Sequence, residues 1–280
     1  MRIAVIGLGL IGGSIALAAR QRLGAEVVGT DIDPTIREAA LAGGAVDRTC
    51  PTAAEAVQGA NAAFVAVPVG GLPDAVGAVL KHAPQECVVS DVGSTKRAIV
   101  AAQADPRFVG GHPMAGLEHS GLRHARGDLF DDATWFLTPS DVSSNTLLER
   151  LRGLLETVGA RPNVIDAESH DRLVAVLSHL PHVVANVLIL QAEATLSPGL
   201  QTFSSAGPSF RDATRVAGAP AEIWADIYAT NADKLALAVE DMVARLRAFQ
   251  EALRSGDPAG IVTFIEVAAT ARARLEQGPR

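Results

Sequence analysis

The chain has 280 residues and a net charge of −7, and hydrophobic residues make up 48% of it. That apolar share excludes intrinsic disorder over most of the chain, and the length fits one large domain or two ordinary ones. The acidic balance argues against a duplex nucleic-acid binder, which normally presents a basic face. An anionic substrate would therefore need a locally basic pocket.

The cysteine content and the N-terminal sequence both bear on location. Cys50 and Cys87 are the only cysteines, and they form neither a CxxC pair nor a metal-ligand spacing. Two thiols in a chain of this length predict a reduced, cytoplasmic protein. The apolar run of residues 3–19 resembles a secretory signal, but glycines interrupt it and no convincing cleavage site follows. We therefore interpret this run as part of the fold rather than as a signal or a membrane span.

The first part of the chain alternates short apolar runs with helical stretches. The runs are nearly continuous in hydrophobicity, which is typical of parallel strands covered on both faces. The expected strands are residues 2–6, 26–31, 61–67, 86–91, 108–111, 134–138 and 161–165. The expected helices are residues 11–21, 34–42, 72–81, 95–103 and 146–157. This alternation predicts a doubly wound α/β sheet of the Rossmann type.

No convincing strand pattern occurs after Asp166. We therefore predict two domains, an α/β domain over residues 1–166 and an all-α domain over residues 167–280. Residues 167–194 have a helical pattern that Pro181 should bend or break, because proline cannot donate to the helix ladder.

The last part of the chain predicts long helices. Apolar residues recur at helical spacing over residues 221–255, and Asp257 before Pro258 predicts the start of a final helix. A long helix with a wide apolar face must bury that face, so we expect it in a homodimer interface. The alternative is a monomeric helical cap.

A dinucleotide-binding pattern follows the first expected strand. Gly7, Gly9 and Gly12 fit G-x-G-x-x-G and open a helix. The first glycine allows a tight turn, the second lets the backbone approach a pyrophosphate, and the third permits close packing of helix and strand. The helix start at Leu10 and Ile11 offers free N–H groups to phosphates. The alternative is a glycine-rich turn without a ligand.

The second expected strand ends at Asp31, where a carboxylate accepts hydrogen bonds from the adenosine ribose and repels a 2′-phosphate. Because Ile32 rather than arginine follows, the sequence favours NAD over NADP. Arg37 is either a contact that favours NADP or a solvated helix charge. Val67 and Pro68 end another strand, and they either form a wall of the nicotinamide ribose site or simply stop the strand.

Two polar residues follow strand ends, where open α/β sheets bind ligands. Ser94 lies in the first of these segments, and His112 precedes Pro113 on a rigid, extended turn in the second. An NAD enzyme that oxidises a carbinol needs a base near the hydroxyl, and histidine suits this at neutral pH. We therefore predict His112 as the base and Ser94 as the hydrogen-bond partner that sets its tautomer. The alternative is a structural histidine.

Two further motifs lie in the helical half. Ser178, His179 and His182 share one side of a helix and predict polar contacts to a substrate. Zinc is the rival interpretation, but no nearby cysteine and no H-E-x-x-H motif supports a metal. Arg215 has the geometry to bind a carboxylate through two N–H groups, with Asp212 one turn away to orient it. The alternative is a surface Arg–Asp pair.

Taken together, these motifs resemble the prephenate/arogenate dehydrogenase family of tyrosine biosynthesis. They are GLGLIGGS at 7–14, DVGSTK at 91–96, GGHPMAG at 110–116, SHLPH at 178–182 and FRDATR at 210–215. The resemblance covers nearly the whole chain and implies a Rossmann-type domain followed by an α-helical dimerisation domain. It also implies a stand-alone enzyme, without a chorismate mutase segment or a regulatory domain.

The resemblance implies NAD-dependent oxidative decarboxylation of prephenate, of arogenate or of both, which yields 4-hydroxyphenylpyruvate or tyrosine. His112 would polarise the substrate hydroxyl with the help of Ser94, and Arg215 would hold a substrate carboxylate. The remaining pocket residues that the resemblance implies are Ser178, His179 and His182, with Glu118 as an acidic residue near the mouth.

Two other functions stay open. One is a different hydroxyacid dehydrogenase with a helical second domain, a class that uses a catalytic lysine on a helix of that domain; Lys234 is the only lysine beyond Lys96. The other is a non-catalytic NAD-binding sensor, which would not need His112, Ser94 and Arg215 together.

Overall fold

The structure, a computed structural model, describes residues 1–116, 119–195 and 206–277. The chain forms two compact units, Met1–Asn231 and Ala232–Arg280. The first unit contains the sheet and also several helices beyond residue 166. The predicted domain boundary at residue 166 therefore stays a prediction.

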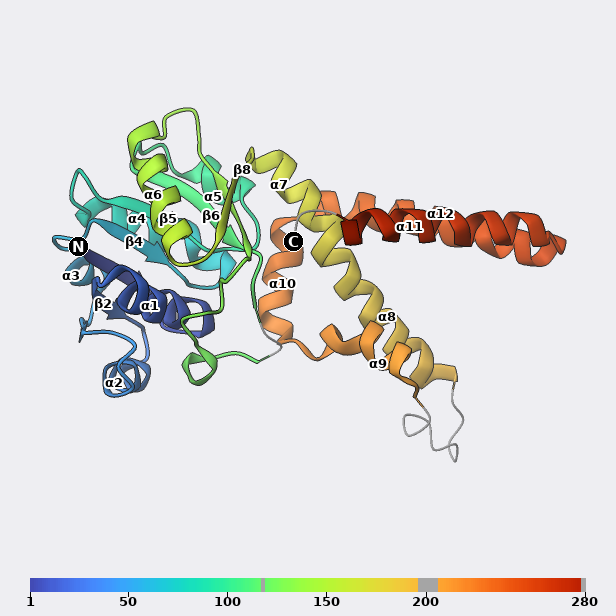
Figure 1. The fold of residues 1–280 in the computed structure, drawn as a ribbon, viewed down its shortest axis with the longest axis horizontal. Coiled ribbons are helices and arrows are strands. Elements are labelled where there is room, and N and C mark those ends of the chain that lie inside the picture. Colours follow the sequence, from blue (N-terminus) through green and yellow to red (C-terminus); the bar gives the residue numbers. More distant parts are fainter. Residues whose placement is uncertain (117–118, 196–205, 278–280) are drawn as a thin grey trace. The chain divides into compact units, whose positions relative to one another are not determined.

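Eight strands of the described residues form one sheet in the order β3-β2-β1-β4-β5-β6-β7-β8 (Figure 1). Their bounds are β1 (Arg2–Ile6), β2 (Glu26–Thr30), β3 (Arg48–Thr49), β4 (Ala62–Val65), β5 (Val88–Asp91), β6 (Phe108–Pro113), β7 (Thr134–Thr138) and β8 (Arg161–Val164). The strands from β1 to β6 are parallel, β7 runs antiparallel to β6, and β8 runs parallel to β7. The predicted doubly wound sheet is confirmed, and its order reverses between β1 and β4, where such folds bind dinucleotides. Only β3, which is two residues long, was not expected.

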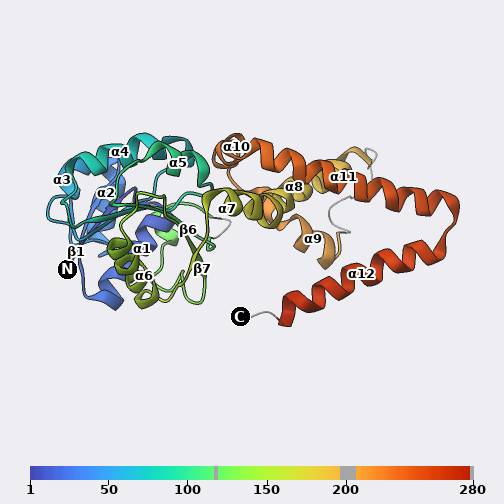
Figure 2. The ribbon, with the colours of Figure 1, turned by 90° about the horizontal axis from the view of Figure 1, so that it is seen from above.

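Helices cover both faces of the sheet (Figure 2). The helices α1 (Leu10–Leu23), α2 (Pro34–Ala42) and α6 (Asn145–Thr157) pack on one face. The helices α3 (Ala53–Ala56), α4 (Leu72–His82) and α5 (Arg97–Ala102) lie on the other. The central strands β1, β4, β5 and β6 are buried on both sides, which explains why their sequences read as apolar runs, whereas the edge strands β3 and β8 are largely exposed. The apolar N-terminal run therefore forms β1 and the first turns of α1.

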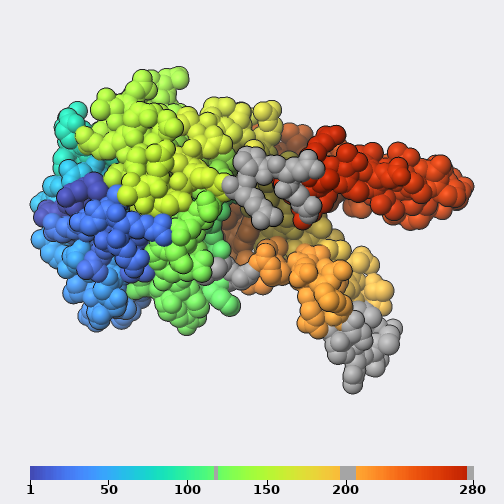
Figure 3. All heavy atoms as spheres, viewed as in Figure 1, coloured from blue at the N-terminus to red at the C-terminus, as the bar shows by residue number. Residues whose placement is uncertain are grey.

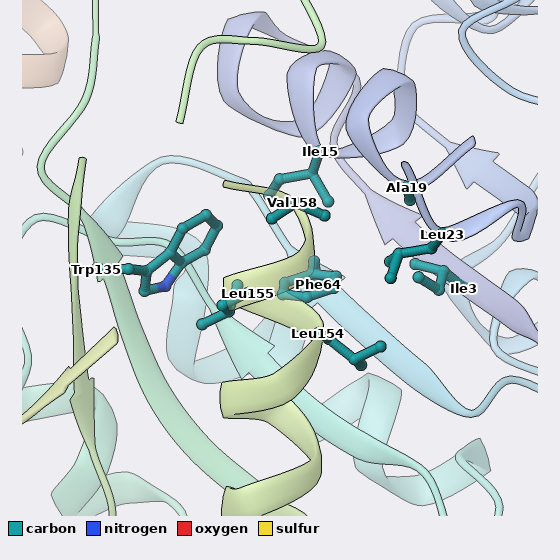
Figure 4. A pocket seen from close by; sticks show the side chains of 9 residues that line it. All are labelled: Ile3, Ile15, Ala19, Leu23, Phe64, Trp135, Leu154, Leu155 and Val158. Carbon is teal, nitrogen blue, oxygen red and sulfur yellow. The ribbon is translucent and has the colours of Figure 1, made fainter. Parts of the chain in front are cut away.

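The core between α1, α6 and the sheet is closely packed (Figure 4). The side chains labelled in Figure 4 line a gap of about 10 Å³. Phe64 and Trp135 meet beside this gap with ring centroids 6.2 Å apart. The lining is entirely apolar, so the gap is too small and too apolar to hold a ligand.

The first helices beyond the sheet run through an irregular turn. The helix α7 (Ala167–Val174) continues through a π-helical turn (Ala175–His179) into α8 (Leu180–Thr195). The disruption expected at Pro181 is confirmed, since the wider turn ends just before the residue that lacks an N–H group. The helix α9 (Pro208–Thr214), a 3-10 turn (Arg215–Gly218) and α10 (Ala221–Thr230) complete the first unit.

The prediction of one helix over residues 221–255 is wrong. The chain leaves helical geometry at Asn231, where φ is −130° and ψ is 28°, and α11 (Ala232–Ser255) starts afresh. Asn231 is fully buried, and its Nδ2 donates to the carbonyl oxygen of Asp171 at 2.7 Å. The break places this amide in the interior of the first unit. No glycine or proline stands at Asn231, and the apolar residues keep their helical spacing on both sides of it. The sequence therefore gives no local signal of the break.

The second unit is a helical hairpin of α11 and α12 (Pro258–Gln277), in which the rings of Phe249 and Phe264 lie 4.9 Å apart. Many large apolar side chains of this unit are exposed. They include Leu237, Leu246, Leu253, Val262, Ile265 and Val267. An exposed apolar surface of this extent is typical of an interaction site.

The helix over Ala167–Thr195 has a similar character. By length and composition this helix would suffice to cross a membrane, but core helices of soluble proteins also meet these criteria. In its most apolar stretch of 18 residues, 28% is buried. Its exposed apolar residues include Val187 and Leu190. A second copy of the chain would cover such residues without a membrane.

We expect a homodimer, with a mass near twice 29.0 kDa by light scattering at micromolar concentration. Leu246→Glu should raise the dimer dissociation constant at least about tenfold, because a carboxylate in an apolar contact costs more than about 1.4 kcal/mol. Arg247→Glu, a charge change at the next exposed position of α11, serves as the control and should change little. A monomer mass for the unmodified chain would contradict this expectation.

Candidate active site

The carboxyl ends of β1, β2 and β4 surround a pocket of about 400 Å³. The predicted cofactor residues Gly7, Gly9, Asp31, Val67 and Pro68 all line it. The helix α1 starts at the same turn, so the predicted contacts Leu10 and Ile11 form its first residues. The structure thus brings the predicted cofactor residues together.

The glycine turn leaves room for a phosphate group. Gly7 has a φ of +92°, and a side chain there would collide with the backbone of Ala66. A side chain at Gly12 would collide with the backbone of Gly7, whereas no atom lies within 4 Å of a Cβ placed at Gly9. Gly9 precedes α1 and provides no side-chain cap, so the first N–H groups of the helix stay available to a pyrophosphate.

Asp31 is held in place by the backbone around it. Its Oδ2 accepts from the Leu8 N–H at 2.8 Å and its Oδ1 from the Asp33 N–H at 3.0 Å. Each carboxylate oxygen keeps a lone pair for a ribose hydroxyl. Arg37 is not a freely solvated charge, because its guanidinium donates to the Asp31 carbonyl oxygen. Ile32 is fully exposed. These residues fit NAD.

A chain of buried polar side chains starts at His112, near the end of β6. The Nδ1 atom of His112 lies 2.9 Å from Nε2 of His170, and Nδ1 of His170 lies 2.8 Å from Oδ1 of Asp171. His112 is 8% exposed, and the other two residues are fully buried. His170 and Asp171 lie in α7, and neither was predicted from the sequence. The available signal was a His-Asp pair in the first helix after the sheet, but nothing local relates it to His112.

The predicted hydrogen bond between Ser94 and His112 is not formed among the described residues, since His170 occupies the Nδ1 position. Ser94 follows Gly93, whose N–H donates to Asp91 Oδ2 at 2.8 Å and anchors the loop to the sheet. Ser94 as a whole residue is half-buried. A catalytic role for Ser94 stays a proposal.

A buried ion pair fixes the strand that carries His112. The Lys96 ammonium and the Asp91 carboxylate are both fully buried and in direct contact. Lys96 Nζ also donates to the Gly111 carbonyl oxygen at 2.7 Å, and Asp91 Oδ1 accepts from the Gly111 N–H at 3.1 Å. Burial lowers the pKa of Lys96, and the nearby Asp91 carboxylate opposes this shift.

The same segment holds Asp171. Its Oδ1 accepts from the Lys96 N–H at 2.7 Å, and its Oδ2 accepts from the N–H and the Nε of Arg97 at 3.0 and 3.3 Å. Burial raises the pKa of Asp171, but hydrogen bonds from His170 and from the Arg97 and Lys96 amides outweigh it, so the pKa is lowered overall. Asp171 is therefore a carboxylate at neutral pH.

His112 is a neutral imidazole with one nitrogen accessible. Burial is the largest cause that holds the pKa of His112 well below 6.5, followed by the proximity of His170, Lys96 and His179. Nε2 of His112 has no partner among the described residues. Four side-chain atoms of those residues are both fully enclosed and without a partner: Trp135 Nε1, Thr138 Oγ1, Arg152 Nε and His179 Nε2. Nε2 of His112 is not among them, so it is not fully enclosed. A ligand can therefore reach Nε2.

Both predicted substrate-binding histidines contact Trp224, His182 by stacking and His179 edge-on with ring centroids 6.2 Å apart. His179 is buried with its Nδ1 3.3 Å from Nδ2 of Asn231, and burial lowers its pKa to about 4. His182 stacks on Trp224 with ring centroids 3.7 Å apart and shares a hydrogen bond with the Tyr228 hydroxyl. Ser178, directly before His179, is half-buried.

Three predicted substrate residues lie elsewhere. Arg215 is exposed in the 3-10 turn that follows α9. Asp212 is exposed too, and in the described part of the chain it forms no ion pair with Arg215. Glu118 lies outside the described residues. Within the described ranges, no group of three or more His, Cys, Asp or Glu side chains could hold a metal ion.

The segment after β6 also packs against the nucleotide-binding helix. Figure 3 shows it in green beside the blue surface of the N-terminal segment. The Arg126 N–H donates to the Ser14 hydroxyl at 3.0 Å, and a side chain at Gly13 would collide with Leu122. The loop that follows His112 is thereby fixed to the helix that opens the nucleotide pocket.

Comparison with known proteins identifies close relatives. The sequence profiles described as "Prephenate dehydrogenase, nucleotide-binding domain" and "Prephenate dehydrogenase, dimerization domain" match residues 15–164 and 166–267. Prephenate dehydrogenase of Bacillus subtilis is 34% identical over 278 residues, which cover 95% of this chain and 74% of the relative.

Solved structures agree with these sequence relatives. Prephenate dehydrogenase of Aquifex aeolicus, solved in complex with hydroxyphenyl propionate and NAD+, has a TM-score of 0.92 at 26% identity over 98% of both chains. Synechocystis arogenate dehydrogenase has a TM-score of 0.83 at 29% identity, and the match covers 98% of this chain and all of that one, 100%.

Asp31→Ser should weaken NAD binding about tenfold or more and reduce the preference over NADP, because charge-assisted hydrogen bonds to the ribose are worth roughly 1.5–3 kcal/mol. Calorimetric titration of each nucleotide measures this. Asp33→Ser is a matched control, since Asp33 caps α2 and does not line the pocket. NADP binding as tight as NAD binding in the unmodified chain would show that the role of Asp31 is wrong.

Lys96→Met should lower the free energy of unfolding by about 3–5 kcal/mol, because it leaves the buried Asp91 carboxylate without its cation. Urea denaturation measures the change. Lys81→Met at an exposed position of α4 is the control and should stay within about 0.5 kcal/mol. A loss under about 1 kcal/mol at Lys96 would mean that its contact with Asp91 does not stabilise the folded chain.

Proposed function

The chain belongs to the prephenate dehydrogenase family, and from this premise we propose that it catalyses the NAD-dependent oxidative decarboxylation of prephenate, of arogenate or of both. We propose further that it works in the cytoplasm as a homodimer. The observation that carries the proposal is the neutral, buried His112, whose accessible Nε2 lies at the same sheet edge as the nucleotide pocket.

Bound NAD supplies the hydride acceptor for the hydroxyl-bearing ring carbon. As that carbon becomes a carbonyl carbon, Nε2 of His112 takes the hydroxyl proton. The bond between the ring and its carboxylate then breaks, carbon dioxide leaves, and the electron pair makes the ring aromatic. The former hydroxyl oxygen becomes a phenolate and recovers the proton from His112. His112 therefore ends each turnover in the state in which it began.

Neither alternative function has a specific observation in its favour. A hydroxyacid dehydrogenase with a catalytic lysine would depend on Lys234, which lies in α11 with its Nζ 3.6 Å from the neighbouring Asp233 carboxylate. A sensor that only binds NAD would have no use for a buried imidazole with one accessible nitrogen. The dehydrogenase function accounts for both the nucleotide pocket and His112.

The appearance of NADH absorbance with prephenate and with arogenate tests the proposal and decides between the two substrates. His112→Asn should lower turnover by about 10²–10⁴, the usual contribution of one acid–base group, and should leave NAD binding unchanged. His82→Asn at an exposed position of α4 is the control. No activity with either substrate, or a loss under about threefold in His112→Asn, would overturn the assignment.

Arg215→Gln should raise the KM for prephenate at least about tenfold with a smaller change in kcat, because it removes a charge-assisted contact worth roughly 1.5–3 kcal/mol. The KM for NAD should not change. Steady-state kinetics with each substrate varied in turn makes the comparison, with Arg245→Gln, an exposed partner of Asp241 in α11, as the control. If both KM values stay unchanged, Arg215 does not bind substrate.

A further inference from the structure

The cations and anions around His170 are already paired with one another. The Asp91 carboxylate contacts the Lys96 ammonium, and the Asp171 carboxylate contacts the Arg97 guanidinium, with Nε 3.3 Å from Oδ2. Two backbone N–H groups also donate to Asp171. His170 is fully buried, and its direct polar partners are the Asp171 carboxylate and the His112 imidazole.

The hydrogen bonds then fix where each proton lies. A carboxylate only accepts, so in a singly protonated His170 ring Nδ1 carries the proton and donates to Asp171 Oδ1. Nε2 of His170 is therefore an acceptor. Since it lies 2.9 Å from Nδ1 of His112, that Nδ1 must carry the proton of His112. Nε2 of His112 is left without a proton, and it is the nitrogen that a ligand can reach.

We propose that His170 and Asp171 are positioning residues that hold His112 as its Nδ1–H tautomer, so that its Nε2 acts as the base toward the substrate hydroxyl. The proposal rests on the proposed function for the identity of the substrate, but the tautomer itself can be observed without substrate. In the reaction, His170 also accepts from the charged form of His112 and stabilises it while that form holds the proton.

The surroundings of His170 contain few other groups that could set the tautomer. Phe136 of β7 meets its ring edge-on at 5.4 Å and has no polar atom. His112 from β6 and Asp171 from α7 are its direct partners. Lys96, Arg97 and His179 lie around this pair, and Lys96 and Arg97 contact the carboxylates rather than His170. The tautomer of His112 thus depends on His170.

The alternative is that His170 only fills space, and two variants separate the roles. His170→Phe keeps a ring but removes the acceptor, whereas His170→Gln keeps an acceptor oxygen but removes the ring. A space-filling role predicts that the phenylalanine variant is the better enzyme. The proposed role predicts the reverse order, with a loss in kcat/KM of at least about tenfold for His170→Phe and a smaller loss for His170→Gln.

The first measurement is the 15N spectrum of the seven histidines in the full-length chain without substrate. We expect the Nδ1–H tautomer for His112 in the unmodified chain, assigned by its loss in His112→Asn, and a mixture or the Nε2–H tautomer in His170→Phe. His82→Phe is the matched control, since it makes the same substitution at an exposed histidine. An Nε2–H tautomer in the unmodified chain overturns the proposal, even if neither His170 variant folds.

The second measurement is the pH profile of kcat/KM. His170→Phe should move the acid limb to lower pH as well as lowering the plateau, because the charged form of His112 loses the acceptor that stabilises it. An unchanged acid limb together with an unchanged His112 tautomer overturns the proposal. Absence of activity in the unmodified chain, with the Nδ1–H tautomer observed, overturns the proposed function instead.

Discussion

The contacts of Lys96 connect the sheet to the helices beyond it. Its side chain neutralises the buried Asp91 carboxylate and binds the carbonyl oxygen of Gly111, while its backbone N–H donates to Asp171. His112 follows Gly111 directly, and His170 precedes Asp171. One residue therefore sets the position of both ends of the His112–His170 hydrogen bond. A buried ion pair adds little net stability, but losing one member leaves a charge that the interior cannot solvate.

Features that depend on neighbours in sequence were predictable. The glycine turn, Asp31 at the end of β2, and the order of strands and helices all follow from local patterns. The hydrogen bond between His112 and His170 joins residues 58 positions apart, and no periodicity relates them. Ser94 is much closer in sequence to His112, which made it the natural candidate, but the Asp91 carboxylate holds its loop by the backbone. Asn231 breaks a helix for a reason that lies in Asp171, again far along the chain.

A π-helical turn ends at the first histidine of the SHLPH motif. In a regular helix His179 and His182 would lie on the same side, as their spacing predicts. Both rings contact Trp224, His182 by stacking and His179 edge-on, and His179 also contacts Asn231. Irregular turns of this kind are frequent at functional sites. The motif thus connects a shared aromatic neighbour to the buried amide at the end of α10.

The burial of His112 limits how it exchanges protons with the solvent. A base that is 8% exposed exchanges poorly with bulk water. Most dehydrogenases that release a proton need a path to carry it away. In the proposed reaction, aromatisation returns the proton to the oxygen that gave it up, so each catalytic cycle is closed with respect to that proton. The enzyme can therefore exclude water from around the imidazole, because it needs no proton-transfer path of waters or side chains to the surface.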